Sequence, residues 1–308
     1  MGRTMITGID LGHSAIRAVT LKPMGNHFVL MGYRELPVTA GIFTDNPKQN
    51  YQEIVKKLKE LRKGLPIFSR RVSLAVPDNS VINKLIQVDS ELSATDIEFS
   101  IAHALSHQST LAMDEIEFDY VPVLEQSPLS DHTSYQVYAT KRELIESRQA
   151  WLKGAGFKPW MFDTKARSLV QLWQFLAVTY QRRDYLLLNV EQQQVQLAID
   201  FFDAAPFMRS FSLADNTLAE ELRRAIERLA IQPGCQINGI WLAGEGGVCD
   251  ERMMALTQSL SLPCHWLSFS DLVRVSKSLK TEEAPSGAYA LAFSLALRGM
   301  AWLEQRHA

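Results

Sequence analysis

The sequence predicts an α/β protein with two lobes. Its 308 residues exceed the roughly 250 to 300 residues beyond which a single hydrophobic core stops growing efficiently. A run of three strand-like segments occurs near the N-terminus and again in the second half, so each lobe is expected to contain its own sheet. Hydrophobic residues make up 46% and charged residues 21% of the chain. This is the composition of an ordinary globular protein, and it excludes disorder.

The first half of the chain mixes strands with amphipathic helices. Apolar residues at every second position predict strands, and apolar residues three or four positions apart predict helices. The helix expected from Tyr51 to Lys63 has a Lys/Arg-rich outer face, which is typical of a solvated surface. The predicted strands are Met5–Gly12, Ala15–Lys22, His27–Leu36, Arg70–Pro77, Ser80–Val88, Asp114–Val123 and Ser134–Lys141, and the predicted helices are Tyr51–Lys63, Ile97–His107 and Lys141–Phe157.

The second half repeats this organisation. The boundary between the lobes is predicted at Gln181-Arg182-Arg183, because a helix ends there and a new strand meander begins. The apolar run Ala288–Leu297 is far shorter than the roughly 20 residues that span a bilayer, so a buried helix is expected. The predicted strands are Asp184–Val190, Gln194–Phe202, Ala205–Leu213 and Ile237–Gly247, and the predicted helices are Lys165–Tyr180 and Leu218–Ala230, the latter with Asp215 or Asn216 as N-cap.

Charge and cysteine content limit the classes of partner and compartment. Lys and Arg number 32 against 34 Asp and Glu, so the chain has no general attraction to nucleic acid or an anionic membrane, and any such contact must be local. Three widely spaced cysteines without a C-x-x-C pair indicate neither disulfides nor a zinc site. The N-terminus reaches Asp10 before an apolar signal region forms. We therefore expect a cytoplasmic location.

The stretch GIDLGHSAIRAV, Gly8–Val19, contains a candidate phosphate turn. Gly12 permits a close turn, and the amides of Gly12, His13 and Ser14 are positioned to face anionic oxygens. Asp10 would meet a metal ion through water. Taken alone, a strand-Gly-strand turn is more often a simple hairpin.

A second glycine-rich turn follows the buried strand IWLAGEGG. Gly244, Gly246 and Gly247 suit close approach of a ligand, although strand-to-helix turns also use glycine for their own geometry. The two turns together favour a nucleotide cleft between the lobes. No nucleophile is indicated, because the sequence contains no G-x-S-x-G elbow and places no Cys/His pair.

These elements resemble the PilM family of type IV pilus assembly, with its relatives HofM and ComA of DNA-uptake operons. The opening GIDLGHSAIRAVTL is similar to that family's first phosphate hairpin, with His13 where Ser is usual and Arg17 where Lys is usual. The run Arg70–Leu105 resembles the inserted small subdomain shared with FtsA, and Ala288–Met300 resembles the last helix, with Ser294 where Gly is usual. The resemblance implies an actin-like, ribonuclease H-like fold with two lobes.

The resemblance also implies a domain plan and a partner. Residues 1–34 and 136–181 would form the core of the first lobe, 35–135 the inserted subdomain, and 182–308 the second lobe, with the fourth subdomain reduced to about 212–220. The family implies a nucleotide cleft and a groove for the cytoplasmic tail of the inner-membrane protein PilN. We expect that groove in the first lobe or along Arg70–Leu85.

The sequence departs from the family where nucleotide would bind. Asn189 and Glu191 stand at the second phosphate hairpin, where an Asp-x-Gly turn is usual, and Glu245 interrupts the glycines of the adenosine turn. A carboxylate near phosphate oxygens opposes binding. If nucleotide binding is retained, the resemblance assigns it to Asp10, Gly12, His13, Ser14, Arg17, Gly244, Gly246 and Gly247, with Asp10 holding Mg²⁺ through water.

Two functions of different classes follow. The favoured one is a non-enzymatic, cytoplasmic adaptor, peripheral to the inner membrane through a PilN-like protein, with no cofactor and no direct contact with nucleic acid. The alternative is a Mg-ATP-binding protein whose nucleotide state gates partner binding. A sugar or acetate kinase on the same fold is a weaker third reading, because no catalytic carboxylate is placed opposite the cleft. Self-association is left open.

Overall fold

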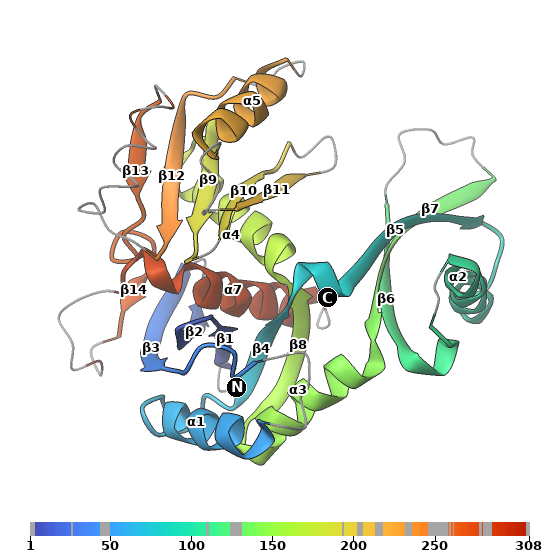
Figure 1. Cartoon of the computed structure of the whole chain (residues 1–308), viewed down its shortest axis with the longest axis horizontal. Helices are drawn as coiled ribbons and strands as arrows, with labels where there is room; N and C mark the ends of the chain where they lie inside the picture. The colour runs from blue at the N-terminus through green and yellow to red at the C-terminus, as the bar shows by residue number, and fades with distance from the viewer. Residues whose placement is uncertain are drawn as a thin grey trace.

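The computed structural model contains two large sheets and one small sheet (Figure 1). The residues that the structure describes are 4–25, 27–43, 50–108, 111–123, 131–192, 194–201, 206–212, 218–231, 236–245, 258, 260, 262–276, 279 and 285–305. The predicted N-cap at Asp215 or Asn216 lies outside them, as do Gly246 and Gly247. Within this part of the chain, no helix combines the length and hydrophobicity that crossing a membrane requires.

The first lobe is built on a six-stranded sheet with the order β14-β3-β2-β1-β4-β8. Its opening hairpin is antiparallel, whereas β4 and β8 join it in parallel. The strands are β1 (Ile6–Leu11), β2 (Ala15–Met24), β3 (His27–Pro37), β4 (Arg71–Val76), β8 (Lys158–Thr164) and β14 (Arg274–Val275).

Helices cover both faces of this sheet because its strands are apolar on both sides. On one face, Ile9, Ile16 and Leu74 pack against α1 (Tyr51–Lys63) and α3 (Arg142–Gly154). On the other face, Ile6, Val19 and Leu21 join the core that contains α4 (Lys165–Tyr180) and α7 (Ala290–Gln305).

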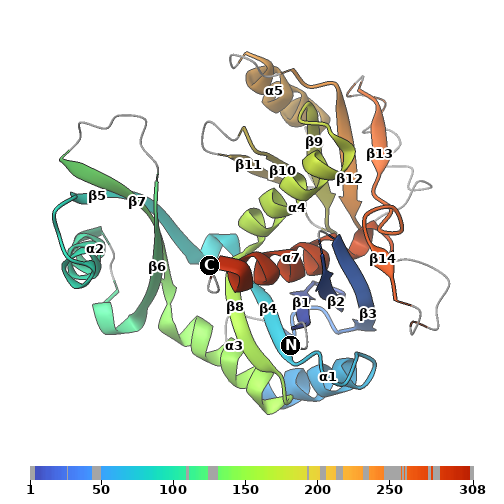
Figure 2. The ribbon, with the colours of Figure 1, turned by 180° about the vertical axis from the view of Figure 1, so that it is seen from behind.

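The second lobe is a five-stranded sheet with the order β11-β10-β9-β12-β13. Its strands are β9 (Tyr185–Val190), β10 (Gln194–Ile199), β11 (Phe207–Ser212), β12 (Gly239–Gly244) and β13 (Cys264–Trp266), and the helix α5 (Leu218–Ala230) also belongs to this lobe. Figures 1 and 2 show α4 and α7 between the two large sheets. One hydrophobic cluster joins these two helices to strands of both lobes.

A small subdomain projects from the first lobe (Figure 1). It consists of the antiparallel sheet β5-β7-β6 and one covering helix. Its elements are β5 (Val81–Asp89), α2 (Ala94–Gln108), β6 (Ile116–Pro122) and β7 (His132–Lys141), with short 3-10 turns at Asp78–Ser80 and Met113–Glu115.

The predicted domain boundaries differ from this arrangement. Residues 35–135 were expected as one insertion, but α1 packs on α3 and β4 lies between β1 and β8, so both belong to the first lobe. Two elements within residues 182–308 also belong to the first lobe and not to the second. β14 pairs with β3, and α7 packs on β1, β2 and β4. These boundaries depend on pairing between strands that are distant in sequence. The periodicity of apolar residues does not reveal which strands pair. Between β11 and α5 only residues 213–217 intervene, at the place where a shortened fourth subdomain was expected.

Candidate functional site

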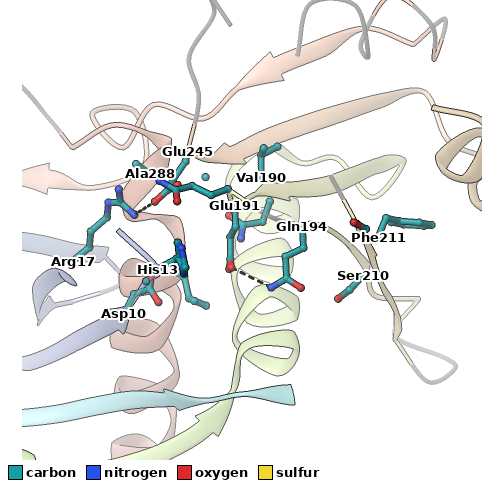
Figure 3. Close-up of a pocket in the computed structure, with 16 residues that line it drawn as sticks. Asp10, His13, Arg17, Val190, Glu191, Gln194, Ser210, Phe211, Glu245 and Ala288 are labelled. Atoms are coloured by element: carbon teal, nitrogen blue, oxygen red, sulfur yellow. Dashed lines mark hydrogen bonds and ion pairs between the residues drawn. The ribbon is translucent and has the colours of Figure 1, made fainter. Parts of the chain in front are cut away.

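A cavity of about 400 Å³ lies between the two lobes. Three turns reach it: the β1–β2 hairpin, the β9–β10 turn and the end of β12 (Figure 3). β9 pairs with β12 in parallel, and Asn189 lies beside Ala243. The turns that follow these two strands therefore start side by side at the same end of the sheet. The lining residues are Asp10, Gly12, His13, Arg17, Asn189, Val190, Glu191, Gln192, Gln194, Ser210, Phe211, Ser212, Gly244, Glu245, Ala288 and Leu291.

One backbone amide in each of the three turns is bonded within the chain. Gly12 N–H donates to the carbonyl of Ala15 at 3.0 Å, Glu191 N–H to Gln194 at 2.8 Å, and Glu245 N–H to Val190 at 2.6 Å. Phosphate-binding turns work by directing such amides at the anion. Of the amides expected to face a nucleotide, that of Gly12 is thus already engaged, as are the amides of Glu191 and Glu245 in the other two turns.

Arg17 crosses the cavity to Glu245. It lies directly opposite Asp10 in the β1–β2 register. Its Nη1 is 2.6 Å from Oε1 of Glu245, and its Nε is 2.6 Å from Oε2 of Glu35. The Ser14 hydroxyl also donates to Glu245, at 3.5 Å. Burial lowers the pKa of Arg17, but hydrogen bonds to Glu245 and Glu35 outweigh it and raise the pKa above its ordinary value.

Lys165 forms a second cross-lobe ion pair and was not anticipated from the sequence. It is the first residue of α4, after the N-cap Thr164, whose hydroxyl accepts a hydrogen bond from Arg167 N–H. Its Nζ is 3.0 Å from both carboxylate oxygens of Glu191. The side chains of Lys165 and Glu191 are 16% and 25% exposed. A strand that ends directly at the N-cap of a helix could have pointed to Lys165. That signal was missed because β8 was not predicted from the sequence.

The charges around Lys165 raise its pKa. Burial lowers that pKa, but the carboxylates of Asp10 and Glu191 more than compensate. Asp78 also contributes to this raised pKa, and its Oδ1 accepts the N–H of Ala166 at 3.1 Å. Lys165 therefore stays protonated and neutralises an acidic group of side chains gathered from both lobes.

Asp10 is a carboxyl group of the cavity with a strongly raised pKa. It is buried, and its Oδ1 has no hydrogen-bond partner among the described residues. Burial raises its pKa to about 6; Glu191 and Glu245 add to the shift, whereas Lys165 and Arg17 oppose it. An uncompensated buried carboxylate oxygen beside a cavity is costly for stability, and such groups are frequent at functional sites.

Two further predicted residues serve the fold of the second lobe. Asn189 is buried and donates from Nδ2 to Oε1 of Gln196 at 3.0 Å, so it bonds to the adjacent strand. Gly244 has φ +95, and a Cβ there would lie 2.1 Å from the carbonyl oxygen of Val190. Glycine is therefore required here because the backbone of β9 comes close to Gly244, and no ligand is needed to explain it.

The described residues do not fit Mg-ATP well. No group of three or more His, Cys, Asp or Glu side chains in this part of the chain is arranged to hold a metal ion. Glu191 and Glu245 line the cavity where the phosphates and the adenosine would approach, and Arg17 and Lys165 already bond to them. A triphosphate would have to displace both ion pairs and then face both carboxylates.

Comparisons with known proteins agree with this architecture. Residues 8–199 match the family model of type IV pilus assembly protein PilM. The structure is similar to the PilM-PilN type IV pilus biogenesis complex, with a TM-score of 0.75, 21% identity, and coverage of 96% of this chain and 99% of that chain. This likeness confirms the actin-like two-lobed fold.

Two other solved structures are more distant. The cytoplasmic domain of EpsL, an inner membrane component of the type II secretion system of Vibrio cholerae, has a TM-score of 0.48 and 9% identity, with coverage of 97% of this chain and 95% of that chain. The ethanolamine utilization protein EutJ from Carboxydothermus hydrogenoformans has a TM-score of 0.46 and 11% identity, with coverage of 96% and 90%. No curated protein has a matching sequence.

Proposed function

Because the chain belongs to the type IV pilus assembly protein PilM family, we propose that it is a non-enzymatic adaptor of a type IV pilus-like or DNA-uptake machine. In this proposal it binds the N-terminal cytoplasmic tail of a PilN-like inner-membrane protein and is held at the membrane by it. The proposal of a PilN-like partner draws on the solved PilM-PilN complex, which has a similar fold.

The observation that carries the non-enzymatic part is the pair of cross-lobe ion pairs, Arg17–Glu245 and Lys165–Glu191. In a nucleotide-binding cleft, cations and amides are left free to meet phosphate oxygens. Here each cation meets a carboxylate of the chain itself. Both ion pairs join the two lobes without a ligand and leave neither cation free for a phosphate group.

Calorimetric titration with Mg-ATP tests this part of the proposal. We expect no binding by the wild-type protein, because the triphosphate would face two carboxylates whose cations are engaged. The double variant Glu191→Gly, Glu245→Gly tests the cause, because it removes both carboxylates and frees Nζ of Lys165 and Nη1 of Arg17, while Nε of Arg17 stays bonded to Glu35. Binding by the double variant but not by the wild type supports the proposal. Micromolar binding by the wild type that Asp10→Ala abolishes would contradict it.

The tail requires an accessible surface, and the small subdomain offers one. In the segment Arg70–Leu85, β4 is paired on both sides, so no peptide can add to it. β5 pairs only with β7 among the described strands, which leaves one edge free. Leu85 on β5 is 59% exposed. An extended peptide that adds to this edge gains main-chain hydrogen bonds and apolar contact.

Substitution of Leu85 tests the position of the tail. With a labelled peptide of the N-terminal tail of a PilN-like protein, Leu85→Asp is expected to weaken binding about tenfold or more, as for an apolar anchor at a small interface. Phe99→Asp is the matched control, because Phe99 is 72% exposed but belongs to α2, which covers the other face of the sheet. Equal losses in the two variants would place the tail elsewhere.

One observation favours the second candidate, an ATP-binding protein whose nucleotide gates the partner. The Asp10 carboxylate has an unpartnered oxygen and lines the cavity, and Mg²⁺ with its water shell is a suitable companion for such a group. This candidate requires Mg-ATP to change the affinity for the tail peptide, and Asp10→Ala to remove that change. Unchanged tail affinity at saturating Mg-ATP would reject it.

A further inference from the structure

The loop between α1 and β4 exposes two large apolar side chains side by side in sequence. Ile67 is 78% exposed and Phe68 is 82% exposed. The loop is held by its own hydrogen bonds: Ser69 N–H and Oγ–H both donate to the carbonyl of Pro66, at 2.9 and 2.6 Å. The fold therefore presents this apolar tip in a defined turn. Contiguous exposed apolar side chains of this kind mark contact sites.

Cations surround the tip. Ile67 lines a hollow of about 490 Å³ together with Lys59, Arg62, Lys63 and Lys153, and no carboxylate belongs to that lining. Two more exposed cations continue the surface at the start of β4 and β8, where Lys158 N–H donates to the carbonyl of Arg70 at 2.7 Å. We call the surface formed by Lys59, Arg62, Lys63, Ile67, Phe68, Arg70, Lys153 and Lys158 the basic tip.

Helix ends account for part of this charge. Arg62 and Lys63 lie in the last turn of α1 and Lys153 in the last turn of α3, whereas Lys59, Arg70 and Lys158 do not occupy such a position. The C-terminal turns of α1 and α3 favour positive charge, and Arg62 does donate from Nη1 to the carbonyl of Ala155 at 3.2 Å. Lys59, Lys63 and Lys153 are exposed and form no ion pair or hydrogen bond among the described residues. The acidic residues of α1, Glu53 and Glu60, do not line the hollow.

We propose that the basic tip is a membrane-contact site, in which Ile67 and Phe68 enter the headgroup region of an anionic lipid bilayer and the surrounding cations bind lipid phosphates. A protein interface buries a broad surface on each partner, whereas here two exposed apolar side chains are bordered by cations. That combination of a small apolar insertion with electrostatic attraction is the one that binds bilayer surfaces reversibly. A second contact beside the PilN-like tail would orient the adaptor on the membrane.

The basic tip lies away from the other candidate surfaces. α1 and α3 form the end of the first lobe that points away from the second-lobe sheet (Figure 1). The cleft between the lobes and the free edge of β5 belong to other parts of the molecule. The membrane contact is therefore independent of both the nucleotide question and the position of the tail, and its failure would leave the proposed function untouched.

Co-sedimentation of the full chain with vesicles tests the proposal. Vesicles of equimolar phosphatidylcholine and phosphatidylglycerol are expected to bind the protein at least tenfold more strongly than pure phosphatidylcholine, since each cation near an anionic surface adds about fivefold. Binding should weaken steeply with added salt. Equal binding to both vesicle types, or no binding to the anionic ones, would overturn the proposal.

Matched variants separate insertion from charge. Ile67→Ser with Phe68→Ser is expected to reduce binding about tenfold, and Lys59→Glu with Lys63→Glu and Lys153→Glu to abolish it. Phe99→Ser removes another exposed aromatic ring, 72% exposed against 82% for Phe68, from a different surface and should leave binding unchanged. Thermal unfolding of each variant verifies that it is folded. Full binding by the serine variant would overturn the insertion of the tip, and equal loss in Phe99→Ser would overturn its location.

Discussion

The Asp10→Asn variant is expected to be more stable than the wild type at about pH 8, by about 3 kcal/mol, and this gain should vanish near pH 4. Burial raises the pKa of Asp10 from 3.8 to about 6 in the folded protein, with Glu191 and Glu245 adding to the shift. The folded state therefore binds more protons than the unfolded state between these two values. Wild-type stability must fall as pH rises through this window, because the unfolded chain ionises more easily. Asparagine does not ionise and removes the penalty.

Urea unfolding of both proteins at several pH values measures the effect. The difference between variant and wild type isolates Asp10, because other groups titrate in both. Asp184→Asn is a control of opposite sign: burial raises the pKa of Asp184, but hydrogen bonding from Asn238 and the nearby Arg182 lower it overall. Its substitution should lower stability slightly at neutral pH. A flat difference for Asp10→Asn across the window would show that Asp10 is not the buried, uncompensated group described above.

The Lys165→Met variant is expected to lose roughly 3 kcal/mol of unfolding free energy at neutral pH. The substitution leaves Glu191 and Asp10 without the cation that neutralises them, in a site where Lys165 is 16% exposed and Glu191 is 25% exposed. Removal of one partner of a buried ion pair costs more than the pair contributes, because the other charge stays in a poorly solvated place. The loss should shrink as the pH falls below about 6, where Asp10 takes up a proton in the folded protein.

A double-mutant cycle distinguishes pairing from packing. Lys165→Met combined with Glu191→Leu is expected to recover most of the loss, because an apolar pair of similar size replaces the ion pair. Arg224→Met is the exposed control: its ion pair with Glu220 lies on the surface of α5, with side chains 63% and 46% exposed, and should contribute less than about 0.5 kcal/mol. If Lys165→Met and Arg224→Met behave alike, the cross-lobe ion pair does not hold the lobes together.

Local patterns in the sequence were enough to predict most elements. The opening hairpin, α1, α4 and the meander β9–β11 lie where periodicity predicts them, because their hydrophobic faces repeat within a few residues. The carboxylates Glu191 and Glu245 were also recognised in advance as departures from a nucleotide site, since each interrupts a short motif. The actin-like fold was implied by the family resemblance that these motifs carry.

The tertiary structure decided how those charges are used and where the lobes divide. Arg17 and Glu245 are 228 positions apart, and only the packing of two sheets brings them to 2.6 Å. The sequence does not distinguish Lys165 from other helical lysines. Its ion pair with Glu191 depends on the position of β8, which pairs with β4 and leads directly into α4. The assignment of β4, β14 and α7 to the first lobe likewise depends on partners distant in sequence. Periodicity determines which face of an element is apolar, but the choice of partner for that face is made by the whole chain.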